Sequence, residues 1–266
     1  MASKNYDYYC PTNIKQLYVQ QFILKAVLKI LRAVRLSINF TVKSGMMKSA
    51  KWNSLIPDSR YILGTYEPNL ALVIKNEVEQ GKRLIDIGAN AGYFSLLASK
   101  YGNKQLTHIA VEPMPENIHF LKQHIKINLA DNIEIYQLAI SDKIGEIEFS
   151  NSGNLAANTY KKESSMFKDD TIVVKTIDLN TFALKNKLDS NCFIKIDVEG
   201  AELDVLKGGL EFLKQHKPTL LLATHDCHVK DVKKDCLDLI TSIGYKYQVL
   251  DDIKIDGQED FLCFCD

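Results

Sequence analysis

No part of the chain constrains its fold more than residues 84–94, which read LIDIGANAGYF. A strand-like run leads into Asp86-x-Gly88-x-Asn90-x-Gly92, and a helical pattern follows directly. Glycines at a strand-to-helix turn allow tight backbone geometry and a close approach by a ligand. In an open parallel sheet such a turn lies at the carboxyl edge, where ligands bind at the switch point of the strand order. The run therefore predicts an α/β fold with a ligand site at this turn.

The rest of the chain after residue 83 alternates short β-type runs with longer helical ones. We expect strands at 84–87, 107–111, 133–138, 193–198 and 219–223, and helices at 92–101, 115–128, 179–188, 201–213 and 229–243. Two antiparallel pairs are expected, 146–149 with 171–174 and 245–250 with 261–264. This alternation predicts a mainly parallel sheet with helices on both faces. The uninterrupted apolar run at 220–223 fits a central strand that is buried on both sides.

Two acidic residues narrow the class of ligand. Asp86 precedes the first glycine, where a carboxylate suits the positively charged amino group of a methionine moiety. Glu112 ends the second strand, where a carboxylate can accept hydrogen bonds from ribose hydroxyls. A nicotinamide dinucleotide would require Gly-x-Gly-x-x-Gly over its pyrophosphate, and an acid at the turn would repel phosphate. A nicotinamide-dependent oxidoreductase is therefore kept only as an alternative, as is a glycine-rich turn without a ligand.

A second informative run, FIKIDVEGAE, occupies residues 193–202. Side chains alternate along a strand, so Lys195 and Asp197 share one face. A lysine and an aspartate inside an otherwise buried strand are costly to desolvate unless they are paired or functional. Asp197 lies at the carboxyl end of this strand, at the same edge as the glycine turn. We interpret Asp197 as a candidate active-site residue, with a structural ion pair to Lys195 as the alternative.

The two runs together resemble the FkbM family of methyltransferases. DIGANAGY at 86–93 is similar to the cofactor loop of that family, and FIKIDVEGAE is similar to its most distinctive signature. Shorter matches are GTYEP at 64–68, VEP at 111–113 and LKGG at 206–209, so that the resemblance covers about residues 60–250. It implies a seven-stranded, Rossmann-like class I methyltransferase fold and methyl transfer from S-adenosylmethionine, commonly to hydroxyl groups of sugars or polyketide-like products.

This resemblance yields a set of expected site residues and an expected acceptor. The expected cofactor-binding residues are Glu67, Asp86, Gly88, Asn90, Gly92, Tyr93, Glu112 and Pro113. The methionine part of the cofactor would lie over the glycine turn, with Asp86 near its amino group and Glu112 on its ribose. We expect O-methylation of a hydroxyl of a sugar, glycan or related natural product, hence a small-molecule or carbohydrate acceptor. Residues 151–170 are expected to cap the acceptor site.

A third polar group, THDCH, follows the apolar run at residues 224–228. An alcohol is a poor nucleophile, so a base should remove its proton as the new bond forms. His225 and Asp197 are the catalytic candidates, with Glu199 next, because histidine exchanges protons near neutral pH. Ala223 stands where the family often has a glutamate. The spacing of His225 and His228 is weak evidence for a metal site, and no metal is predicted.

Charge is unevenly distributed along the chain. Residues 1–56 contain nine Lys or Arg and one acid, and residues 14–40 follow an apolar helical pattern with Lys25, Lys29 and Arg32 on one stripe. We expect a basic amphipathic helical extension and linker at 1–56 and a methyltransferase domain at 57–266. The helix either contacts a membrane as a peripheral anchor or packs on the domain as a lid or dimer contact.

The same asymmetry bears on partners and location. Nucleic-acid binding is not expected, because the remainder of the chain is acidic and would be repelled. A nonenzymatic module of this fold that docks through the basic helix is a further alternative. No secretory signal is evident and the six cysteines form no Cys-x-x-Cys pair, so we expect a reducing, cytoplasmic location. The membrane interpretation would place the chain at the inner face of a membrane.

Overall fold

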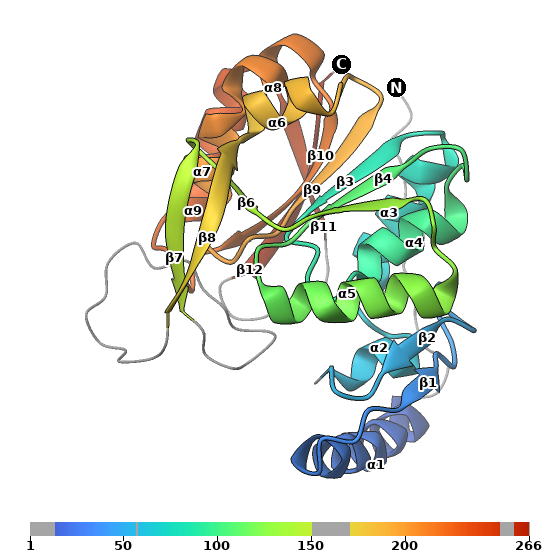
Figure 1. Cartoon of the computed structure of the whole chain (residues 1–266). Helices are drawn as coiled ribbons and strands as arrows, with labels where there is room; N and C mark the ends of the chain where they lie inside the picture. The colour runs from blue at the N-terminus through green and yellow to red at the C-terminus, as the bar shows by residue number, and fades with distance from the viewer. Residues whose placement is uncertain (1–13, 57, 151–170, 251–257, 266) are drawn as a thin grey trace.

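The computed structural model describes residues 14–56, 58–150, 171–250 and 258–265, with a seven-stranded sheet at the centre (Figure 1). Its strands are β3 (Arg83–Ile87), β4 (His108–Val111), β5 (Ile133–Tyr136), β9 (Cys192–Ile196), β10 (Thr219–His225), β11 (Lys246–Leu250) and β12 (Gln258–Phe264). The order is β11-β12-β10-β9-β3-β4-β5, and β12 is antiparallel to both of its neighbours while the other pairs are parallel. The predicted α/β fold with a mainly parallel sheet is confirmed.

Helices cover both faces of this sheet (Figure 1). They are α3 (Pro68–Glu79), α4 (Tyr93–Tyr101), α5 (Pro115–Asn128), α6 (Leu179–Lys185), α7 (Glu202–Gly208), α8 (Leu210–His216) and α9 (Val232–Ser242). Because side chains alternate along a strand, Leu84 of β3 joins the apolar cluster with α3 and α4, whereas Ile85 and Ile87 join the cluster with α6 to α9. Asp86 therefore lies on the α3 and α4 face.

The predicted helix at 201–213 is two short helices, α7 and α8, which meet at Gly209. A Cβ atom on Gly208 would overlap with the carbonyl group of Ser141, and one on Gly209 would press against Leu179. The two glycines thus let other backbone and side-chain atoms approach closely, and the helix breaks there because glycine is a poor helix former.

A separate three-stranded sheet adjoins the main one. It consists of β6 (Ala139–Ser141), β7 (Gly145–Ser150) and β8 (Thr171–Asp178), in the order β6-β8-β7. The predicted pairing of 146–149 with 171–174 is confirmed. The strand predicted at 133–138 ends at Tyr136 instead, because the chain leaves the main sheet there and enters β6. Residues 151–170, expected to cap the acceptor site, lie outside the described residues.

The segment before the main sheet is more structured than expected. Helix α1 (Ile14–Ala33) ends at Ala33 rather than at residue 40, and β1 (Asn39–Thr41) pairs with β2 (Lys51–Asn53) before the short helix α2 (Ser59–Leu63). The part of this extension that follows residue 40, expected to be a linker, contains Trp52, which is 1% exposed. The indole stacks on His124 of α5, with ring centroids 4.0 Å apart. This segment therefore joins the same apolar cluster as α3 and α4.

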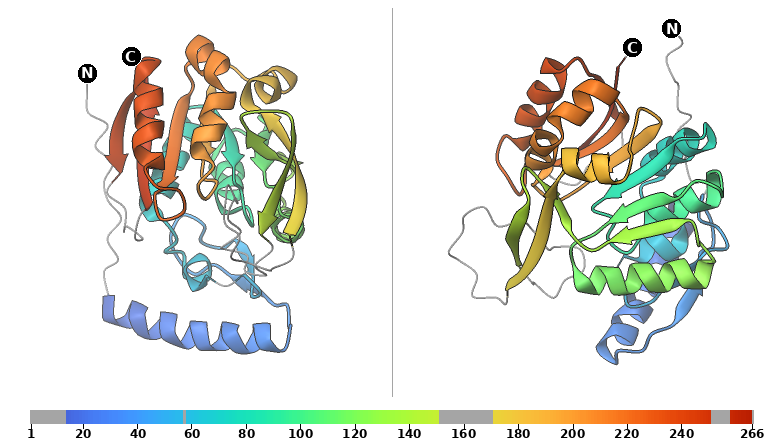
Figure 2. Two further views of the ribbon diagram at one scale, coloured as in Figure 1. Left: turned by 90° about the vertical axis from the view of Figure 1, so that its left-hand side faces the viewer. Right: turned by 45° about the horizontal axis from the view of Figure 1, so that its top comes forward.

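Helix α1 lies at one end of the molecule, beyond β1, β2 and α2 (Figures 1 and 2). It contacts the body through Leu28, which is fully buried, and through Leu24 and Leu31, which are partly buried. Among the described residues, no helix combines the length and the apolar character needed to cross a bilayer.

Candidate active site

The turn after β3 requires glycine at two positions. Gly88 has φ +81° and Gly92 has φ +92°, in the left-handed region that glycine adopts without strain. A Cβ atom on Gly88 would overlap with the carbonyl group of Asp197, and one on Gly92 would overlap with the side chain of Leu121. Asn90 lies between them with φ +49°, and its side-chain oxygen accepts a hydrogen bond from the next backbone N–H at 2.7 Å. The glycine pattern therefore brings the ends of β3 and β9 into direct backbone contact.

Glu112 follows β4 and ties it to this turn. Its Oε2 atom accepts a hydrogen bond from the backbone N–H of Asn90 at 2.8 Å. Its Oε1 atom accepts hydrogen bonds from the Met114 N–H at 2.9 Å and from the Asn117 side-chain amide at 3.2 Å. Burial raises the pKa of Glu112, although the three hydrogen bonds oppose that rise. Since a carboxylate can accept about four hydrogen bonds, Glu112 can accept one more from a ligand hydroxyl.

Lys195 of β9 is buried between two carboxylates. Its Nζ atom lies 3.4 Å from Asp86 Oδ1 and 3.0 Å from Asp197 Oδ2, and 5.3 Å from the ring centroid of Phe94. Burial lowers the pKa of Lys195, but the charges of Asp197 and Asp86 outweigh that effect and raise it. The Oδ2 atom of Asp86 accepts a hydrogen bond from the Ser95 hydroxyl at 2.6 Å. The ion pair of Lys195 with Asp197, left open by the sequence, is therefore present and also includes Asp86.

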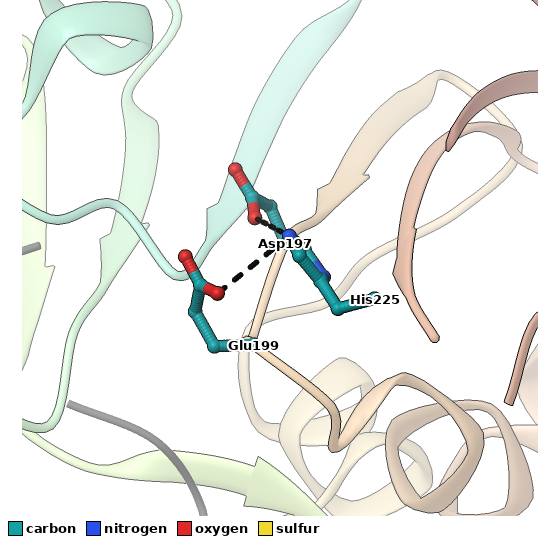
Figure 3. Close-up of side chains that lie close together, drawn as sticks. All are labelled: Asp197, Glu199 and His225. Carbon is teal, nitrogen blue, oxygen red and sulfur yellow. Dashed lines mark ion pairs between the residues drawn. The ribbon is translucent and has the colours of Figure 1, made fainter. Parts of the chain in front are cut away.

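Three predicted catalytic residues meet at the carboxyl ends of β9 and β10, and we call Asp197, Glu199 and His225 the carboxylate–histidine cluster (Figure 3). The Nε2 atom of His225 lies 3.5 Å from Asp197 Oδ1 and 3.7 Å from Glu199 Oε2. On the other side of the ring, Nδ1 donates a hydrogen bond to Glu202 Oε1 at 2.8 Å. That Glu202 oxygen also accepts a hydrogen bond from the Gly200 N–H. The imidazole is thus held from behind by a buried carboxylate and faces two others.

These carboxylates determine the charge of His225. Burial by itself lowers the pKa of His225, but the hydrogen bond to Glu202 and the charges of Asp197 and Glu199 outweigh burial and raise it to about 9. For Asp197, burial acts to raise the pKa, but the charges of Lys195 and His225 lower it below its usual value. At neutral pH the cluster therefore contains an imidazolium beside an ionised Asp197.

Glu199 occupies the most accessible position in the cluster. Its side chain is 37% exposed, compared with 4% for His225, and its Oε2 atom lies 2.8 Å from His228 Nε2. Its φ is +54°, an unfavourable conformation for a residue with a Cβ atom, and such strain is concentrated at functional sites. Burial and the charge of Asp197 raise the pKa of Glu199. Glu199 is therefore a carboxylate whose proton affinity has been increased where a ligand can reach it.

The carboxylate–histidine cluster also has the ligand types of a metal site. One oxygen from each carboxylate and one nitrogen of His225 lie within 4.8 Å of one another. A divalent cation would have to share this space with the ammonium group of Lys195, which lies 3.0 Å from Asp197, and would have to displace the proton of His225. Lys195 and the protonated His225 therefore already supply positive charge here, although the carboxylates that they contact, Asp86, Asp197, Glu199 and Glu202, outnumber them.

A pocket of about 1020 Å³, measured out to the solvent, opens beside the glycine turn. The predicted site residues that line it are Gly88, Asn90, Tyr93, Glu112, Pro113, Asp197 and Glu199. The predicted site residues that do not line it are Glu67, Asp86, Gly92 and His225. Lining residues that sequence reasoning missed include Tyr61, Tyr66, Phe94, Asn117, Ser141 and Phe149. Tyr66 could have been found from its place in the GTYEP motif. No sequence pattern pointed to Asn117, whose Oδ1 atom is buried and has no hydrogen-bond partner among the described residues.

The positive charges near Glu67 are too few to keep its carboxyl group ionised at neutral pH. Glu67 begins α3 with φ +37°, and its Oε2 atom is buried and lacks a hydrogen-bond partner among the residues that the structure describes. Burial, reinforced by the charges of Asp197 and Asp260, raises the pKa of Glu67 to about 8. A ligand cation near Glu67 and Asp197 would stabilise their charged forms.

Comparisons with known proteins agree with this arrangement. The chain matches the methyltransferase FkbM domain over residues 86–257. It is 24% identical over 196 residues to the hexuronic acid methyltransferase AglP of Haloferax volcanii, a match that covers 74% of this chain and 75% of that protein. It is also 26% identical over 111 residues to the ribosomal protein L11 methyltransferase of Acetivibrio thermocellus, where the match spans 41% of this chain and 35% of the relative.

Two solved structures are similar in fold. An O-methyltransferase from Bacillus cereus in complex with SAH superposes with a TM-score of 0.50 at 11% identity, covering 91% of this chain and 89% of that one. The FkbM methyltransferase from Methylobacillus flagellatus has a TM-score of 0.49 at 19% identity, covering 69% of this chain and 43% of that one. The chain thus spans less than half the length of that protein. The likeness at 0.50 shows the Rossmann-like methyltransferase fold.

The residues of the pocket fit S-adenosylmethionine. Glu112 and Asn117 offer acceptors for ribose hydroxyls, while Asp197 supplies negative charge for a cationic ligand. The match to a methyltransferase family argues against the alternative that the chain is a nicotinamide-dependent oxidoreductase. Because its domain covers residues 86–257, this chain belongs to the FkbM family of methyltransferases, and its methyl donor is S-adenosylmethionine.

Proposed function

We propose that the chain methylates a hydroxyl group of a sugar or related polyhydroxylated acceptor. One observation carries the proposal: a single pocket runs from Glu112 beside the glycine turn to Asp197 and Glu199 at the end of β9. When bound, S-adenosylmethionine supplies a methyl group on a positively charged sulfur. The pocket would hold this donor next to an acceptor, and alignment of the two reactants accounts for much of the rate of such a transfer.

Glu199 is the proposed general base. His225 already holds a proton at neutral pH, because its pKa is raised to about 9, and it does not line the pocket. Glu199 does line the pocket, and a carboxylate with a raised pKa accepts a proton more readily. As the acceptor hydroxyl is methylated, its proton would pass to the carboxylate of Glu199. His225 then serves as a positioning residue that holds Asp197 and Glu199 in place.

The charge of the site favours a hydroxyl over a carboxylate as the acceptor. A carboxylate acceptor would need no base, and Asp197 and Glu199 would repel it. A hydroxyl is neutral and needs the base that Glu199 provides. The relative from Haloferax volcanii is named for hexuronic acid, which supports a sugar as the acceptor class. Cofactor roles for Glu67, Asp86, Gly88, Asn90, Gly92, Tyr93, Glu112 and Pro113 remain predictions of the same proposal.

Two measurements test this function. Calorimetric titration with S-adenosylhomocysteine should give saturable binding that NAD does not, and Glu112→Ala should abolish it. Turnover with a panel of glycans and lipid-linked sugars should fall by about 10²- to 10⁴-fold in Glu199→Gln, with the affinity for S-adenosylhomocysteine unchanged. Glu211→Gln, at an exposed position of α8, is the matched control.

Different failures have different meanings. Lack of S-adenosylhomocysteine binding by folded protein would overturn the donor assignment. Full turnover in Glu199→Gln, together with its loss in Asp197→Asn at unchanged cofactor affinity, would move the base to Asp197. Turnover only with carboxylate acceptors would contradict the choice of a hydroxyl.

A further inference from the structure

Helix α1 exposes an apolar surface on the side turned away from the body of the protein. Its exposed apolar residues, which we call the outer face, are Val19, Phe22, Ile23, Val27 and Ile30, followed by Val34 just after the helix. Phe22 is 77% exposed and Ile30 is 63% exposed. These positions recur at intervals of three and four residues, so they form one stripe. A helix at the surface of a globular protein usually presents polar residues there.

The outer face is distinct from the side of α1 that packs on the protein. At 3.6 residues per turn, Leu24, Leu28 and Leu31 centre about 130° around the helix axis from the outer face, and these three are the residues that join the apolar cluster of the body. In both orientations of the molecule, α1 lies beyond β1, β2 and α2 (Figure 2). The sequence left open whether this helix packs on the domain or contacts a membrane. One side of α1 packs on the domain, and the outer face remains exposed for a further contact.

A stripe of positive charge borders the outer face. Lys25, Lys29 and Arg32 follow one another at intervals of four and three residues, between the packing side and Phe22. Lys25 and Lys29 are exposed, and Arg32 is partly buried with its Nε donating a hydrogen bond to the Leu28 carbonyl. Residues 14–56 contain eight Lys or Arg and no Asp or Glu. The surface thus combines exposed apolar side chains with uncompensated positive charge.

We propose that the outer face of α1 docks on a bilayer containing anionic lipids. The helix would lie in the plane of the interface, with Phe22, Ile23 and Ile30 at the boundary between head groups and acyl chains and Lys25 and Lys29 at the lipid phosphates. Charge complementarity selects this occupant over a second copy of the chain. Two copies joined through this face would bring together two basic segments without a single acid to pair with. Docking does not depend on methyl transfer or on its acceptor.

Vesicle cosedimentation of the full chain tests the proposal. At low salt the protein should sediment with vesicles of phosphatidylcholine and phosphatidylglycerol, and much less with phosphatidylcholine alone. Raising the salt concentration should weaken binding. Because each basic residue near an anionic surface contributes about a fivefold change in partitioning, Lys25→Glu with Lys29→Glu should reduce it by about 25-fold or more. Phe22→Ser with Ile30→Ser should reduce it by about tenfold or more.

Matched controls lie on other surfaces. Leu184 of α6 is 81% exposed, so Leu184→Ser removes an equally exposed apolar side chain, and Lys185→Glu with Lys214→Glu reverses two exposed charges. Both controls should bind vesicles like the wild type, and all variants should keep the wild-type thermal midpoint because every substituted side chain is exposed.

Three outcomes would overturn the proposal. One is the absence of binding to anionic vesicles at low salt. Another is an equal loss of binding in the control variants. The third is a dimer, detected by light scattering, that Phe22→Ser with Ile30→Ser converts to a monomer, since the outer face would then be covered by a second copy.

Discussion

The proton on His225 should be visible in the stability of the protein. His225→Asn keeps a neutral amide donor for Glu202 and removes the titrating ring. The pKa of His225 rises from 6.5 to about 9 on folding, and the side chain is buried, so the shift corresponds to about 3 kcal/mol. Because the pKa of His225 is higher in the folded state, its protonation stabilises the fold fully below pH 6.5. This contribution to the free energy of unfolding is lost as the pH rises through about 9.

The assay is urea unfolding below pH 6.5 and above pH 9, in wild type and variant. Trp52 is the single tryptophan and is 1% exposed, so its fluorescence reports unfolding. Wild type should lose about 3 kcal/mol more than His225→Asn across this interval. The contribution of Glu67 to the free energy of unfolding also falls as pH rises from 4.5 to about 8, the raised pKa of this residue. Because Glu67 is present in both proteins, its contribution cancels in the comparison.

An equal pH dependence in the two proteins would refute the reasoning. It would mean that His225 is neutral in the folded state at neutral pH. His225 would then be free to accept a proton, and the argument that gives the base role to Glu199 would fail with it.

Three further predictions follow from the same geometry. Gly88→Ala should destabilise the fold by about 2–5 kcal/mol in urea unfolding, because the new Cβ meets backbone of Asp197, whereas Gly81→Ala, at φ +89° with open space around it, should lose only about 1–2 kcal/mol. Lys195→Met should lower the free energy of unfolding by about 3–5 kcal/mol, because the buried Asp86 and the half-buried Asp197 lose their cation; adding Asp86→Asn should restore part of it. Extensive chelation should leave turnover within about twofold, because Lys195 and the protonated His225 already lie beside the carboxylates that a divalent cation would need; restoration of lost activity by a divalent cation would contradict this.

The main sheet could be predicted because its signals are local. The glycine turn and the alternation of apolar runs with helical ones depend only on neighbouring residues, and the seven strands of the main sheet lie where these patterns indicate. The segment at 39–63 gave no such signal, because β1, β2 and α2 are three to five residues long. Elements that short show no clear periodicity, and their stability comes from the burial of Trp52 against α5.

The site was predictable in composition but not in its pairings. Asp86 and Lys195 are direct partners in the register of β3 and β9, so Asp86 faces a buried cation instead of the pocket. That register depends on how two distant strands align, which one strand does not reveal. The same holds for His225, whose ring is drawn toward Glu202 of α7. A pattern at the end of β10 shows that a histidine is present, but not which carboxylates surround it.

The position of β12 has a consequence for how the chain is made. β12 lies between β10 and β11 although it follows both in sequence, and among the described strands β11 pairs with β12 alone. On the ribosome, β11 therefore emerges before the strand that will hold it, while β10 presents an open edge of unpaired N–H and C=O groups. Until residues 258–264 leave the exit tunnel, the nascent chain has an unpaired, aggregation-prone sheet edge that a chaperone could shield. The last described strand then inserts between two strands made before it, so that this side of the sheet closes only after β12 has been synthesised.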